Sequence, residues 1–76
     1  MFTYNISKSA DRNEFKRACA LIESNIKDAK KEKPLIDVDG SIIQIYDTKE
    51  GKIKVYNDYE VDAVYVDAEV NLSAIL

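Results

Sequence analysis

The chain has 76 residues, of which 46% are hydrophobic and 33% charged, and this size and balance predict one small globular domain over residues 1–76. It has no histidine and one cysteine, so it cannot form an intramolecular disulfide and lacks the usual ligands of zinc and haem. We therefore expect no metal and no cofactor. No apolar run approaches the length of a membrane span, and we expect a cytoplasmic protein without membrane contact.

The net charge of −3 conceals an uneven distribution along the chain. Residues 1–33 hold eight Lys and Arg and five Asp and Glu, a balance of +3, whereas residues 34–76 hold three Lys and nine Asp and Glu, a balance of −6. Residues 55–76 contain five acids and no base. Such an asymmetry concerns the choice of partner more than the fold.

The first half of the chain predicts a strand followed by a helix. Apolar and polar residues alternate over residues 2–7, which is typical of a strand. Ser9 can cap the helix that follows, with Asp11 in its first turn. A stripe of apolar residues at helical spacing predicts an amphipathic helix over roughly residues 10–32, which Pro34 ends. This stripe consists of Phe15, Ala18, Cys19, Ile22, Ile26 and Ala29.

Two hairpins are predicted after the helix. Asp39-Gly40 joins strands at residues 35–38 and 41–48 as a two-residue turn, because both central residues of a type I′ turn need positive φ. Residues 49–51 join the second strand to a third at residues 52–57 as a three-residue loop that ends on the left-handed Gly51.

The faces of these strands follow from the register. Pairing Thr48 with Lys52 puts Tyr46 and Tyr56 on the sheet face away from the helix, and a last strand over residues 62–72 adds Tyr65 to that face. The predicted fold class is α+β, with the order β-α-β-β-β-β: one antiparallel sheet with a single helix packed on one face. The place of the first strand in the sheet stays open. The residues predicted to face the helix are Ile43, Ile45, Ile53, Val55, Val64, Val66, Ala68, Val70 and Leu72.

The stretch PLIDVDGSII, residues 34–43, looks like the nucleophile loop of haloacid-dehalogenase-type phosphatases, with Asp37 as the attacking residue. That loop ends a parallel strand in a doubly wound domain with several crossover helices, whereas this chain predicts one helix. The chain also has no glycine-rich phosphate loop and no histidine that could activate a nucleophile. We interpret Asp39-Gly40 as a turn and predict no catalytic residue and no enzymatic activity.

The acidic second half is the remaining feature with functional meaning. Carboxylates two residues apart on a strand share a face about 7 Å apart, so Asp58, Glu60 and Asp62 can form one row and Asp67 with Glu69 another. The two rows have opposite parity and share a face only if a bulge or bend lies between them. Like charges in a row repel each other, which favours a role in binding, and the alternative is a role in solubility and edge protection.

In size, acidity and layout the chain resembles the small acidic DNA-mimic proteins of bacteriophages, in particular the host-takeover inhibitors of the bacterial nucleoid protein HU. The resemblance implies a non-enzymatic inhibitor that covers the basic DNA-binding surface of an HU dimer in the host cytoplasm or nucleoid and binds no nucleic acid itself. It requires the acidic and basic side chains to be segregated. The residues assigned to partner binding are Asp37, Asp39, Asp47, Glu50, Asp58, Glu60, Asp62, Asp67 and Glu69, with Tyr46, Tyr56 and Tyr65 as aromatic anchors.

Two alternatives stay open beside this reading. Arg12, Lys16, Lys27 and Lys30 fall on one flank of the predicted helix, where they could contact nucleic-acid phosphates directly. The chain could instead be a general protein-interaction module. Its apolar ending, residues 73–76, either packs on the domain or contacts a second copy, so a homodimer is also open.

Overall fold

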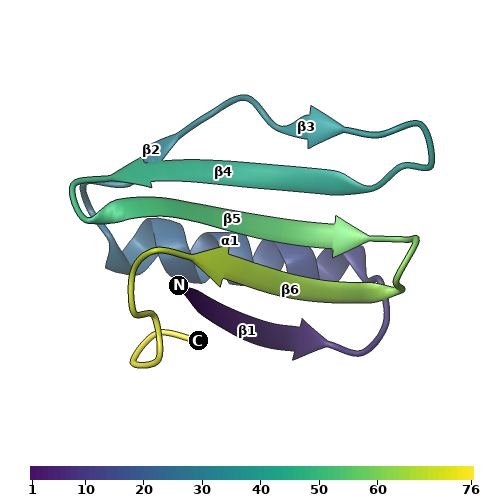
Figure 1. Ribbon diagram of the computed structural model, residues 1–76, viewed down its shortest axis with the longest axis horizontal. Helices are drawn as coiled ribbons and strands as arrows, with labels where there is room; N and C mark the ends of the chain where they lie inside the picture. The colour runs from purple at the N-terminus through teal and green to yellow at the C-terminus, as the bar shows by residue number, and fades with distance from the viewer.

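The computed structural model describes all 76 residues and contains one helix and one six-stranded antiparallel sheet, which confirms the predicted α+β class. The helix lies across one face of the sheet, and no element covers the other face (Figure 1). The elements are β1 (Phe2–Ser7), α1 (Arg12–Asn25), β2 (Lys30–Lys31), β3 (Leu35–Ile36), β4 (Ile42–Thr48), β5 (Gly51–Asp58) and β6 (Ala63–Ala68).

The strand order is β1-β6-β5-β4-β2, and β3 also pairs with β4. The chain therefore places its first strand at one edge, beside its last strand, with a bulge between Asn5 and Ser7. The opposite edge consists of β2 and β3, two strands of two residues each that follow one another along β4. This arrangement answers the question that the sequence left open about the first strand.

The helix is shorter than predicted at both ends. Asp11, and not Ser9, is the N-cap, because its carboxylate accepts hydrogen bonds from the backbone N–H groups of Asn13 and Glu14 at 2.8 and 3.2 Å. The helix ends at Asn25, whose side chain donates to the carbonyl of Leu21 at 2.8 Å. Residues 30–31 form β2 instead of a last helical turn, because their backbone pairs with the edge of β4.

The two hairpin loops differ in length from the prediction. The first loop has three residues instead of two, and the second has two instead of three. The N–H of Asp37 donates to the carbonyl of Ser41, so the first hairpin closes around a three-residue loop, residues 38–40, with Gly40 at φ 87°. In the second hairpin Thr48 pairs with Gly51, which leaves only residues 49–50 between the paired positions. The first loop ends on Gly40 and the second is followed by the paired Gly51; both glycines have positive φ, so the glycine positions alone do not distinguish the two lengths.

This one-residue shift reverses the predicted faces of β4, because alternate residues of a strand point to opposite sides. Tyr46 pairs with Ile53 and faces the helix, whereas Ile43 and Ile45 pair with Tyr56 and Lys54 on the open face. The predicted faces of β5 and β6 are correct, but the last strand, predicted over residues 62–72, ends at Ala68, and the strand predicted over residues 35–38 ends at Ile36. The residues of β5 and β6 that pack against the helix are Ile53, Val55, Val64, Val66 and Ala68.

One hydrophobic core joins the helix to the sheet. The buried helix residues Phe15, Ala18, Cys19 and Ile22 belong to the predicted stripe, which confirms Cys19 as a core residue. Leu72, beyond the end of β6, also reaches the core, and the backbone N–H of Leu72 donates to the hydroxyl of Tyr4 at 2.7 Å. The core therefore occupies one side of the sheet and leaves the other side open to solvent.

Candidate functional site

The open face of the sheet carries a row of apolar and aromatic side chains that crosses four strands. Leu35 pairs with Ile43, Ile43 with Tyr56, and Tyr56 with Tyr65, so the four residues lie side by side. The rings of Tyr56 and Tyr65 stack with centroids 4.5 Å apart and planes 13° apart. We call these four residues the aromatic band. Such stacked tyrosines offer rigid contact area and hydroxyl groups, which are the properties of interface anchors.

The tyrosines of the band stay protonated at neutral pH. Burial, followed by the hydrogen bond that its hydroxyl donates to Asp58, raises the pKa of Tyr65 to about 12. Burial and the negative charges of Asp67 and Asp58 also raise the pKa of Tyr56. Both hydroxyls therefore remain hydrogen-bond donors.

A groove of about 260 Å³ lies along one side of the aromatic band, between the loop after β3 and the turn after β5. Its apolar wall includes Leu35, Ile43 and Tyr56, and it contains no lysine or arginine. The carboxylates that line it are Asp37, Asp39, Asp58 and Glu60. We call this cavity the acidic groove. None of its four carboxylates belongs to any of the four ion pairs of the protein.

Local turns hold three of these carboxylates in place. Asp37 and Asp39 accept hydrogen bonds from the backbone N–H groups of Val38 and Ser41 at 2.7 and 2.9 Å. The bonds from Ser41 keep the pKa of Asp39 below its usual value. Asp58 accepts from the N–H groups of residues 60 and 61 and from the hydroxyl of Tyr65 at 3.0, 3.4 and 3.1 Å. These donors occupy some oxygen lone pairs and leave the negative charges uncompensated.

Glu60 differs from the other three because its side chain makes no hydrogen bond and no ion pair within the protein. It is exposed in the turn between β5 and β6. Its charge is therefore not compensated by any group within the protein.

The predicted row of Asp58, Glu60 and Asp62 does not form, because the chain reverses direction at these residues. Residues 59–62 make the turn between β5 and β6, and Asp62 has a φ of 54°. The carboxylate of Asp62 accepts from the N–H of Ala10 at 2.8 Å and ties this turn to the segment before the helix. Asp58 and Glu60 join the acidic groove, and Asp62 does not line it.

Asp67 and Glu69 lie beyond the other side of the aromatic band. Asp67 accepts a hydrogen bond from the hydroxyl of Thr3 at 2.9 Å, and Glu69 accepts one from the N–H of Lys52 at 2.8 Å. Both line a second cavity of about 190 Å³ together with Lys52 and Lys54. Positive and negative side chains are therefore mixed in this part of the open face.

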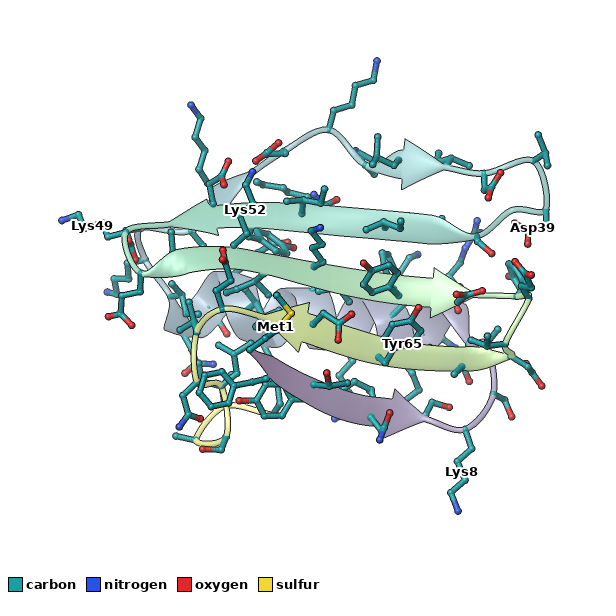
Figure 2. The ribbon with its side chains drawn as sticks, viewed as in Figure 1. Met1, Lys8, Asp39, Lys49, Lys52 and Tyr65 are labelled. Atoms are coloured by element: carbon teal, nitrogen blue, oxygen red, sulfur yellow. The ribbon has the colours of Figure 1, made fainter.

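Asp47 and Glu50 lie at the far end of the sheet from the acidic groove. The carboxylate of Asp47 forms an ion pair with Lys52 at 3.1 Å, and Lys52 also contacts Glu32 at 3.6 Å. Figure 2 shows Asp39 at one end of the sheet and Lys49 and Lys52 at the other. The nine predicted carboxylates thus divide between two ends and the centre, and only four gather without a cation.

The assignment of Tyr46 to the binding surface is wrong. Its side chain is fully buried on the helix side of the sheet, where its hydroxyl donates to the carboxylate of Glu23 at 2.5 Å. Burial and this hydrogen bond raise the pKa of Tyr46. Leu35 and Ile43 take its place on the open face. The sequence could have indicated Ile43 only through the correct loop length before Gly51, which sets the register of β4 with β5, and Leu35 only through the loop that ends on Gly40, which sets the register of β3 with β4.

The predicted basic flank of the helix does not form either. Because α1 ends at Asn25, Lys27 lies beyond the helix and Lys30 lies in β2. Arg12 and Lys16 remain on the helix and are exposed. No three His, Cys, Asp or Glu side chains come together in a way that could hold a metal ion, and no helix has the length and apolar character needed to cross a membrane.

Comparisons of this chain with family models, curated proteins and solved structures found no match.

Proposed function

We propose that this protein is a non-enzymatic inhibitor that binds a basic DNA-binding protein through the acidic groove and the adjoining aromatic band. The observation that carries the proposal is the grouping of Asp37, Asp39, Asp58 and Glu60 around one groove without any lysine or arginine. A surface of this kind repels nucleic acid and attracts a protein whose own surface binds phosphates.

The aromatic band makes the surface suitable for a protein partner. Electrostatic attraction alone gives speed and orientation of binding, whereas affinity depends on apolar anchors that exclude water. Leu35 is 57% exposed in the free protein and, with the stacked pair of Tyr56 and Tyr65, provides such an anchor beside the carboxylates. The combination supports a specific interface more than a general solubilising role.

The partner class follows from the resemblance to bacteriophage DNA mimics. A histone-like nucleoid protein such as the HU dimer offers the basic DNA-binding surface that this site would cover, in the cytoplasm or nucleoid of a host bacterium. In this proposal the acidic side chains are separated from the basic ones only at the end of the sheet that carries the acidic groove. The mixed charges around Asp47, Asp67 and Glu69 have at most a secondary part.

A competition experiment tests the proposal. Purified HU is bound to a fluorescent DNA duplex, and the anisotropy of the duplex is followed as this protein is added at several salt concentrations. We expect the protein to release the duplex at low salt and to lose this ability as salt rises, because salt screens attraction between exposed charges. A protein that leaves the HU complex intact at low salt, or that shifts the duplex without HU, would contradict the proposed function.

A further inference from the structure

The edge strand β1 has one side without a backbone partner. Its inner side pairs with β6, and β1 ends the strand order of the sheet. Nine backbone hydrogen bonds lie outside the regular helix and strand pairings, and none of them involves residues 2–7. Figure 1 shows β1 along the free margin of the sheet. Its outward N–H and C=O groups are therefore available to another strand.

The two edges of the sheet differ in a way that matters for association. The β4 edge is covered by two strands of only two residues, it carries the exposed Lys30 and Lys31, and Pro34 interrupts it. Short strands, lysines and proline are the usual means by which proteins prevent edge-to-edge pairing. The six residues of β1, FTYNIS, contain no charge and no proline.

A small groove of about 170 Å³ lies on the helix-facing side of β1, between this strand and the helix. Its apolar lining comes from Ile6, Ala18, Leu21 and Leu76, with Asn5 and Arg17 beside them. A strand that pairs with β1 would place its inward side chains over this groove. The edge thus offers backbone pairing and apolar burial at the same place.

We propose that β1 pairs antiparallel with β1 of a second copy of this chain, so that the two sheets form one continuous sheet with both helices on the same side. Charge is compatible with a second copy, whose β1 brings the same uncharged, proline-free edge to the contact. The strand is uncharged, and Arg17 at the groove is already paired with Glu14 at 2.6 Å, so two copies bring no uncompensated like charges together along β1. A two-fold axis pairs the same strand from both copies, as in most homodimers.

The acidic groove takes no part in this contact, because it lies among β3, β4 and β5 while β1 forms the opposite edge. A dimer of this kind would therefore keep two acidic grooves free. The dimer and the proposed function can be tested and can fail separately.

Sedimentation equilibrium over a range of concentrations tests the dimer. We expect the average mass of the natural protein to rise from 8.6 kDa toward twice that value. Asn5→Lys places a lysine on each edge strand and should weaken dimerisation at least roughly tenfold. Asn13→Lys, the same change on the exposed surface of the helix, should leave dimerisation unchanged, and so should Glu60→Lys in the acidic groove.

Hydrogen exchange gives a second readout that does not depend on how well a variant folds. The outward amides of residues 2–7 should become more protected as the concentration of the natural protein rises. A mass that stays at 8.6 kDa up to millimolar concentration would overturn the proposal. A dimer that forms without protection of these amides would also overturn it. The same holds for a dimer whose dissociation constant is unchanged both by Leu21→Glu, in the groove beside β1, and by Asn5→Lys.

Discussion

The hydroxyl of Tyr65 donates a hydrogen bond of 3.1 Å to the carboxylate of Asp58, which also caps the turn that carries Glu60. One carboxylate thus connects the aromatic band, the turn after β5 and the acidic groove. The negative charge of Asp58 remains uncompensated by any lysine or arginine, so its neighbours fix its position without removing its attraction for a cation.

Tyr65→Phe removes this hydrogen bond and keeps the stacked ring. We expect the free energy of unfolding in urea to fall by about 0.5–1.5 kcal/mol, less than for a fully buried bond to a charged group, because Tyr65 is only half-buried and water can replace part of the bond. Tyr59→Phe is the matched control, because the side chain of Tyr59 is 49% exposed and its hydroxyl makes no hydrogen bond within the protein. Equal effects of the two changes would show that the bond to Asp58 contributes nothing to stability.

Tyr46→Phe tests the corrected position of Tyr46. The change removes a buried hydroxyl that donates to the carboxylate of Glu23, and bonds to charged groups contribute about 1.5–3 kcal/mol. We expect a loss of stability in that range by urea unfolding. Glu23→Gln keeps an acceptor for the hydroxyl and should cost less. A neutral Tyr46→Phe would contradict the inward position of this tyrosine.

Stability should fall at alkaline pH. Folding raises the pKa of Tyr65 from 10.0 to about 12, and it also raises the pKa of Tyr46, so the folded protein holds these protons more tightly than the unfolded chain. Their contribution is complete below pH 10 and is lost as pH rises above 10. Urea unfolding at neutral pH and above pH 10 measures this loss, and Tyr65→Phe should reduce it. A stability that stays constant across this interval would be inconsistent with the buried hydroxyls.

The two glycines should respond differently to substitution by alanine. At Gly51 a Cβ atom would lie 2.6 Å from Cβ of Glu69, and φ is 143°, so both crowding and backbone strain oppose the change. At Gly40, with φ 87°, the nearest atom is a ring carbon of Tyr59 at 3.5 Å, so only backbone strain remains. Thermal unfolding should show a loss of about 3 kcal/mol for Gly51→Ala and about 1 kcal/mol for Gly40→Ala. The reverse order would contradict the close packing of Glu69 on Gly51.

The sequence was sufficient where a pattern extended over a whole element. The alternation in residues 2–7 predicted a strand, and the helix stripe from Phe15 to Ile22 and the inward row of β6 predicted buried faces that the structure contains. These patterns depend on the backbone period alone, which each segment carries within itself.

The sequence was insufficient where the outcome depended on pairing between distant segments. The lysines after Asn25 are compatible with a helix end as well as with an edge strand. Residues 30–31 form a strand because their backbone pairs with the edge of β4. A glycine at the end of a loop fits a two-residue or a three-residue connection, and this ambiguity reversed the faces of β4. The acidic groove joins residues 37–39 to residues 58–60, so it could not be derived before the register was known.

A matched pair of charge reversals tests the acidic groove most directly. Glu60 and Glu50 are both exposed in turns at an end of β5, and neither side chain makes a hydrogen bond or an ion pair, but only Glu60 lines the groove. Each change to lysine alters the net charge by the same amount. The measurement is the affinity of each variant for purified HU by titration calorimetry at low salt.

We predict that Glu60→Lys weakens this affinity at least about tenfold, or about 1.4 kcal/mol, and that Glu50→Lys changes it less than about twofold. Equal losses for the two variants would mean that only net charge attracts the partner. An affinity that neither change alters would remove the acidic groove from the interface.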